Sequence, residues 1–132
     1  MAYLEPLIGA LAAFALGFVW YTYLFGKAWQ AEANVDPELA QKHMARTHGL
    51  AIVMMYIMSY AVNIMINYHD VADQTFAHGA FHAVQAGLFY AAPAIAIHYL
   101  YQQKSLKMYL IDTLYVLAFL GLSGGIMGAL KL

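Results

Sequence analysis

Histidines in the middle of the chain have the type and spacing of metal ligands. His78 and His82 are four residues apart, which places both on one face of a helix, and His69 and Asp73 closely precede them. Imidazole nitrogens and carboxylate oxygens are ligands that Zn²⁺ accepts. The helix of a zinc metalloprotease has a glutamate between its two histidines, and no glutamate lies between His78 and His82. The pattern leaves two interpretations open: a divalent-metal site, or solvated loop residues and hydrogen bonds between helices.

Two neighbouring apolar segments also carry polar side chains at helical spacing. They are Ser59, Asn63 and Asn67 on residues 49–68, and His78, His82 and Gln85 on residues 76–101. If these segments form an antiparallel hairpin, the stripes meet in polar layers that pair Asn67 with His78, Asn63 with His82 and Ser59 with Gln85. One interpretation is that the layers only join the helices by hydrogen bonds. The other is a polar pocket or proton path, for which histidine is suited because it titrates near neutral pH.

Another pair of ionisable residues, His98 and Asp112, is expected near the connector that follows residue 101. The two side chains would lie at similar depth, and one interpretation is that they form a hydrogen bond or an ion pair. The favoured interpretation is that each reaches the nearby membrane interface separately. We predict no catalytic residues, because the sequence shows no paired buried carboxylates, no nucleophile–base set and no phosphate loop. We also expect no cofactor, with a divalent metal as the alternative.

The elements that must position these residues are long apolar runs. They are Tyr3–Phe25, Gly49–Tyr68, Phe76–Tyr101 and Met108–Leu130. A helix needs about twenty residues to cross a bilayer, and each run has at least about that length. Hydrophobic residues make up 64% of the 132 residues and charged residues 10%, whereas about 25% of a soluble domain is charged. The sequence therefore predicts one all-α domain over residues 1–132, an integral membrane four-helix bundle of antiparallel spans with short connectors.

Basic residues predict the orientation of this bundle. The first connector carries Lys27, Lys42 and Arg46, the third carries Lys104 and Lys107, and the second carries none. Short basic loops stay in the cytoplasm. We therefore expect the first and third connectors inside a bacterial inner membrane, and the second connector and both termini outside, with Lys131 as the one exception. Asp36 and Pro37 predict the start of a short cytoplasmic helix before the second span.

Small residues at four-residue spacing predict where the spans touch, because lipid gives apolar helices no hydrophobic reason to associate. They are Gly79, Ala83, Gly87 and Ala91 on the third span, and Gly121, Gly124, Gly125 and Gly128 on the fourth. On both spans, polar residues follow the opposite face, so each span is expected to contact neighbours on two sides. A bundle of four helices offers limited room for such contacts. We therefore predict a homo-oligomer in the lipid bilayer.

The remaining composition narrows the function classes. No basic stripe of the kind that nucleic-acid binding requires is present. Cysteine is absent, which excludes disulfides, thiolate metal sites and cysteine nucleophiles. We expect a multi-pass membrane protein that binds or passes a small solute or protons, or that assists a partner membrane protein. The alternative is a membrane-embedded, metal-dependent enzyme that uses the His/Asp cluster.

Two stretches of the chain resemble a known family. Residues Leu16–Trp29 contain the element Trp-Tyr-x-x-x-Phe-Gly-Lys-x-Trp, which resembles the opening signature of the small bacterial membrane family called domain of unknown function 1761. Residues Lys104–Tyr115, followed by a Gly-rich end, resemble the final span of that family. The resemblance implies a four-span fold over essentially the whole chain, and it supplies no catalytic residues.

Overall fold

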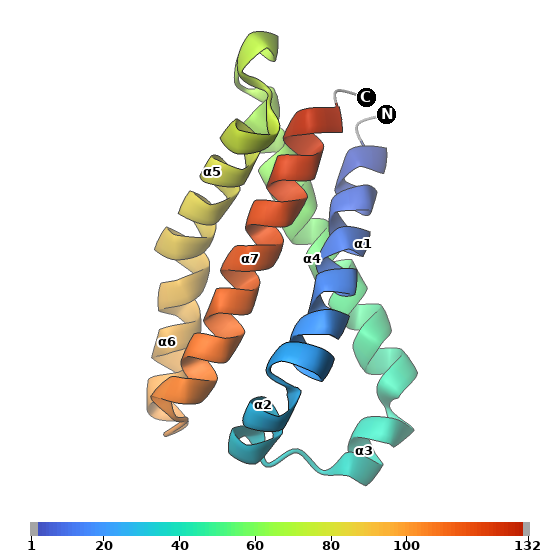
Figure 1. Ribbon diagram of the computed structural model, residues 1–132, viewed down its shortest axis with the longest axis vertical. Helices are drawn as coiled ribbons and strands as arrows, with labels where there is room; N and C mark the ends of the chain where they lie inside the picture. The colour runs from blue at the N-terminus through green and yellow to red at the C-terminus, as the bar shows by residue number, and fades with distance from the viewer. Residues whose placement is uncertain (1–2, 131–132) are drawn as a thin grey trace.

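Four helical spans run side by side in alternating directions (Figure 1). The computed structural model describes residues 3–130, and within this range there are helices, turns and bends but no strand. The spans are Leu4–Leu24, Met44–Asn67, Phe76–Tyr101 and Leu106–Leu130, each long and apolar enough to cross a bilayer. The predicted all-α bundle of four spans is therefore confirmed, and the chain is a membrane protein. Residues 1–2 and 131–132, including Lys131, lie outside the described residues.

Two of the spans contain a wide π-helical turn. The first span consists of α1, Leu4–Val19, and the π-helical turn η1, Trp20–Leu24. The third consists of α5, Phe76–Ala86, the π-helical turn η3, Gly87–Ala91, and α6, Ala92–Tyr101. The second and fourth spans are α4, Met44–Asn67, and α7, Leu106–Leu130. Pro93 is the second residue of α6 and has no N–H group, so the wide turn before it lets the span continue where a regular helix would lose a hydrogen bond.

The first connector contains two short helices, α2 (Gly26–Ala33) and α3 (Pro37–Lys42). Asn34 lies between them with a φ of 50°, in the left-handed region that asparagine tolerates. The Asp36 side chain accepts hydrogen bonds from the N–H groups of Glu38 at 2.9 Å and Leu39 at 3.3 Å, which starts α3. The chain leaves helical geometry at His43 before α4 begins, so α3 is a separate helix and not an extension of the second span.

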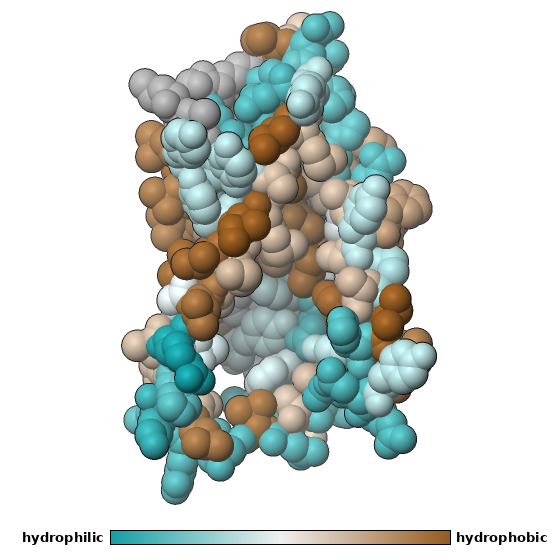
Figure 2. Space-filling model, turned by 180° about the vertical axis from the view of Figure 1, so that it is seen from behind, coloured by the Kyte–Doolittle hydropathy of each residue, from teal (hydrophilic) through white to brown (hydrophobic). Residues whose placement is uncertain are grey.

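The two ends of the bundle differ in their connectors. One end carries the short 3-10 turn η2, Val71–Asp73, together with the start of α1 and the end of α7 (Figure 1). The other end carries α2, α3 and the turn between α6 and α7. We call them the η2 end and the α3 end. Hydrophilic residues gather toward both ends of the surface shown in Figure 2, and apolar residues cover much of the region between them.

The fourth span, α7, is the central element of the bundle. It packs closely against α5 and α1, and also contacts α4 and α6. Half of its most apolar stretch is buried, against 17–22% for the other three spans. The outward faces of the other spans carry large apolar side chains, such as Ile57 (55% exposed) and Phe81 (62% exposed). Such apolar faces suit the hydrocarbon of a bilayer.

Glycines allow the backbones of α5 and α7 to touch. A methyl group on Gly79 would overlap the Gly124 carbonyl oxygen, and one on Gly128 would overlap the Thr75 carbonyl oxygen. On Gly124 it would lie 2.5 Å from the Ala83 side chain. Close backbone approach of this kind is what holds apolar helices together in lipid. The small residues expected to form contacts on the third and fourth spans therefore meet each other within one chain.

The remaining small residues of this set receive side chains from the facing helix. A methyl group on Gly87 would lie 2.7 Å from the Leu120 side chain, on Gly125 2.6 Å from Phe76, and on Gly121 2.9 Å from Val84. Ala91, at the end of η3, is half-buried. Along the α5–α7 contact, the two backbones thus touch at some glycines, and at others a side chain of the facing helix fills the space above the glycine.

Candidate functional site

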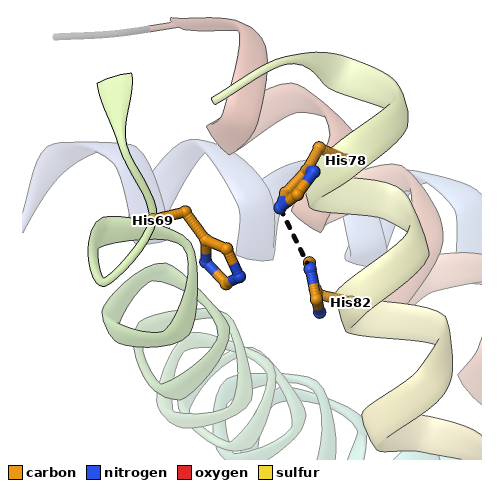
Figure 3. Close-up of side chains that lie close together, drawn as sticks. All are labelled: His69, His78 and His82. Carbon is orange, nitrogen blue, oxygen red and sulfur yellow. Dashed lines mark hydrogen bonds between the residues drawn. The ribbon is translucent and has the colours of Figure 1, made fainter. Parts of the chain in front are cut away.

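Three histidines converge at the η2 end, between the end of the second span and the start of the third (Figure 3). His69 follows α4 in the connector, whereas His78 and His82 lie one turn apart on α5. One ring nitrogen of each histidine lies within 4.8 Å of the others, and all three side chains are half-buried. The predicted metal-ligand residues His69, His78 and His82 are therefore brought together, although they come from two spans.

Hydrogen bonds to the backbone orient His69. Its Nδ1 lies 3.0 Å from the Met65 carbonyl oxygen, and Gln74 Nε2 donates to the His69 carbonyl oxygen at 3.0 Å. A carbonyl oxygen only accepts hydrogen bonds, so Nδ1 carries the proton. The neutral ring then has its lone pair on Nε2, where a metal ion can bind. Such a carbonyl contact is the usual way in which proteins fix the tautomer of a metal-binding histidine.

His78 and His82 already share a hydrogen bond, with their Nε2 atoms 3.0 Å apart. One of the two nitrogens must donate and the other accept, so one proton lies between two lone-pair positions. The Thr75 hydroxyl accepts a hydrogen bond from the His78 backbone N–H at 3.3 Å and starts α5. This cap fixes where the helix begins, and therefore how the two imidazoles face His69.

The spacing of the imidazoles suits a transition-metal ion. Zn²⁺ binds imidazole nitrogen at about 2.0–2.1 Å, so the nitrogens of a tetrahedral site are about 3.3 Å apart. The observed separations, from 3.0 Å in the bonded pair to at most 4.8 Å, bracket this value. The ring centroids of His69 lie 4.6 Å from His78 and 4.4 Å from His82. Small rotations of side chains that are only half-buried would complete such a site.

Asp73, the fourth residue of the predicted metal set, is not part of the group. It ends the turn η2 and is exposed, and the metal-binding arrangement consists of the three histidines alone. A 3-10 turn between His69 and α5 carries Asp73 away from the imidazoles. Asp73 follows His69 by only four residues, and this short spacing gives no indication of the turn between them.

The expected polar layers between the second and third spans are corrected by the packing of α4. Ser59 is fully buried, and its Oγ would lie 3.2 Å from a methyl group on Gly9 of α1, next to Ser123 of α7. Asn63 is also buried, but Asn67 and Gln85 are exposed. Ser59 thus faces α1 and α7, because Gly9 on α1 leaves room for its side chain. Of the predicted cluster, the histidines assemble and Gln85 forms a side-chain hydrogen bond with His82.

A second polar cluster forms near the α3 end around Asp112. Tyr21 in η1 donates a hydrogen bond of 2.6 Å to Asp112 Oδ1, and Tyr99 in α6 donates to Oδ2. His98, one possible partner considered from the sequence, is exposed, and the hydrogen bonds of Asp112 go to the two tyrosines. The carboxylate therefore joins three spans through two phenols, in place of a pair with histidine.

Sequence reasoning missed Tyr21 and Tyr99 as partners of Asp112. Aromatic residues near a membrane boundary are typical interfacial anchors, which conceals any more specific role. One feature of the sequence could have indicated these partners: a single carboxylate in an apolar span needs hydrogen-bond donors at its own depth in the membrane. Tyr99 lies on the neighbouring span close to the same connector and satisfies that condition.

Comparison with known proteins gives one result. No curated protein and no solved structure matches the chain. Residues 4–128 match the model of the family described as protein of unknown function, DUF1761. The match covers nearly all of the chain, as the two stretches near its ends predicted. The chain is therefore a member of the DUF1761 family of proteins.

Proposed function

We propose that this membrane protein binds a divalent transition-metal ion through His69, His78 and His82. The observation that carries the proposal is the convergence of three imidazole nitrogens within 4.8 Å. Three histidines with a fourth position left to water or another ligand form a common zinc coordination set. The sequence suggested a protein that binds or passes a small solute, and this proposal specifies the solute as a metal ion. It assigns no catalytic residue, and the metal-dependent enzyme remains the alternative.

The surroundings of the three histidines support a metal ion over a purely structural contact. His69 presents its Nε2 lone pair because Nδ1 is occupied by the Met65 carbonyl oxygen. The three rings are half-buried, so an ion can reach them from the aqueous side of the connector. Imidazole ligands suit Zn²⁺, Cu²⁺ and Ni²⁺ far better than Mg²⁺ or Ca²⁺.

The experiment is a titration of the full-length protein in mild detergent, stripped of metal beforehand. Isothermal titration calorimetry with Zn²⁺ should show equimolar binding, and Co²⁺ should give the visible absorption of a site with nitrogen ligands. The double variant His78→Ala/His82→Ala should lose this binding. The matched control is His98→Ala, which removes an exposed histidine from the same span and should bind as the wild type does. Equal binding by the wild type and the double variant would end the proposal.

We also infer the orientation and the assembly of the chain. The connectors at the α3 end carry the basic residues, so this end faces the cytoplasm of a bacterial cell. The metal site then lies at the outer side of the inner membrane. Asn67 and His98 are exposed on the surfaces of the spans, whereas the exposed Gln85 forms a hydrogen bond with His82. Polar groups facing hydrocarbon are costly, and a second copy of the chain would cover them, which supports a homo-oligomer. Native mass spectrometry from mild detergent tests this, since a uniform monomer would contradict it.

A further inference from the structure

We propose a second binding site around Asp112 for a small organic cation with apolar substituents. This site lies near the α3 end, away from the histidines, and does not depend on the proposed metal site. Its centre is the Asp112 carboxylate, which lies seven residues into the fourth span and is only half-buried. An ionisable residue inside a span marks a functional site more often than a structural one.

The Asp112 carboxylate has hydrogen-bond donors but no basic partner among the described residues. Both carboxylate oxygens accept phenol hydrogens, one from Tyr21 and one from Tyr99. Within residues 3–130 no lysine, arginine or histidine forms an ion pair with it. A negative charge in an apolar environment without a counter-charge strongly favours a cation beside it.

Aromatic rings pack against Tyr21, one of the two phenols that bond this carboxylate. The Tyr21 ring lies 5.1 Å from Tyr115 and 5.6 Å from Trp29, and Trp20 lies 6.1 Å from Tyr115. Trp20 is held by its indole N–H, which donates to the Ile111 carbonyl oxygen at 3.1 Å. The faces of aromatic rings attract cations, most strongly where water is excluded. The carboxylate and the rings packed beside its phenols therefore provide both parts of a site for an organic cation.

A hollow lies in the surface toward the same end of the bundle as this cluster. Figure 2 shows the lower half of one face hollowed between the parts of α4 and α6 nearest the α3 end, with less apolar residues on its floor. α4 packs against α1, α7 and α5 and makes at most marginal contact with α6, so the two helices diverge toward the α3 end. The spans that carry Tyr21, Tyr99 and Asp112 border this opening.

Charges at the rim determine what kind of cation fits. Lys104 lies with its Nζ 5.9 Å from the centroid of the Tyr99 ring, so a ring of the cluster already faces a cation. Lys104 and Lys107 in the connector oppose the approach of a hydrophilic cation from water. A lipophilic cation can instead enter from the hydrocarbon, through the side of the hollow. The site is therefore assigned to organic cations whose charge is shielded by apolar groups.

The test uses tetraphenylphosphonium and the full-length protein in mild detergent, with binding followed by equilibrium dialysis and by tryptophan fluorescence. Saturable binding is expected for the wild type, and Asp112→Asn should weaken it by at least about tenfold. The matched control is Asp70→Asn, which removes an exposed carboxylate from the other end of the bundle and should bind as the wild type does. His78→Ala/His82→Ala should also bind normally, so failure of the metal proposal leaves this one intact.

A second pair of variants keeps the test decisive if Asp112→Asn does not fold. Tyr99→Phe keeps the ring and loses only the hydroxyl, so binding should stay within a few-fold of the wild type. Tyr99→Leu removes the ring and should weaken binding further, by about tenfold. A folded Asp112→Asn variant with wild-type affinity would overturn the proposal. So would equal binding by Tyr99→Phe and Tyr99→Leu, or wild-type uptake that never saturates.

Discussion

At Gly124, the backbones of α5 and α7 are in direct contact. A methyl group there would lie 2.5 Å from the Ala83 side chain and 2.6 Å from the Gly79 carbonyl oxygen. Neither neighbour is the end of a flexible side chain, so the helices themselves would have to move apart. In hydrocarbon this costs dispersion contacts that no hydrophobic effect replaces.

We therefore expect Gly124→Ala to destabilise the bundle by about 1–3 kcal/mol. Gly49→Ala is the matched control, because Gly49 lies inside α4 and a methyl group there meets nothing within 4 Å. That variant should be unchanged or more stable by about 0.5–1 kcal/mol, since glycine is a poor helix former. Unfolding in mixed detergent micelles, followed by circular dichroism, measures both. Equal stability of the two variants would refute the role given to Gly124.

The hydroxyl of Tyr21 has a comparable role at the α3 end. Tyr21→Phe removes one of two hydrogen bonds to Asp112 and leaves the ring in place, so we expect a loss of about 1 kcal/mol. Tyr23→Phe removes a hydroxyl from a side chain that is 74% exposed two residues away, and it should have no measurable effect. The same unfolding assay distinguishes them. A Tyr21→Phe variant as stable as the wild type would mean that the Tyr21 hydroxyl contributes nothing to joining the spans.

At the scale of single elements, the wide turns decide which side chains reach each site. η1 contains both Trp20 and Tyr21, which bond to two adjacent residues of α7. A π-helical turn advances fewer degrees per residue than an α-helix and so re-aims the side chains that it contains. The second wide turn, η3, lies where Pro93 prevents a regular hydrogen bond and where Gly87 admits Leu120.

The cap of α3 offers a test at the same scale. Asp36→Ala removes the acceptor for the Glu38 and Leu39 amides, which should destabilise α3 locally by about 1 kcal/mol. Hydrogen exchange of the connector should then be faster by about fivefold, with the four spans unaffected. Gln41→Ala, at an exposed position within α3, is the control and should leave the exchange rate unchanged. Faster exchange in the spans as well would show that α3 is coupled to the bundle.

For the whole molecule, the arrangement of the connectors can be tested because the chain contains no cysteine. Ala72→Cys and Gln102→Cys place single thiols at exposed positions at opposite ends of the bundle. In intact bacterial cells, a membrane-impermeant maleimide should label position 72 at once and position 102 only after permeabilisation. Labelling of both positions from one side would contradict four spans. The reverse pattern would keep the spans and invert the orientation.

The sequence predicts the architecture well and the sites only in part. Lengths of apolar runs define spans, and Gly79 and Gly124 mark a contact, because both are local properties. His78 and His82 follow from one helical turn, and His69 from its short distance along the chain. The partners of Asp112 do not follow, because Tyr21 is 91 residues away and reaches it through a turn that no residue pattern announces. Ser59 was assigned to the wrong neighbour because its stripe cannot show which helix it faces.

The central place of α7 has a consequence for biogenesis. It is the last of the four spans to leave the ribosome, yet α1, α4 and α5 each pack against it. Until α7 is inserted, α1, α4 and α5 lack the helix against which all three pack, and the glycine surface of α5 is uncovered. The packing of these four spans is therefore complete only once α7 has joined the other three.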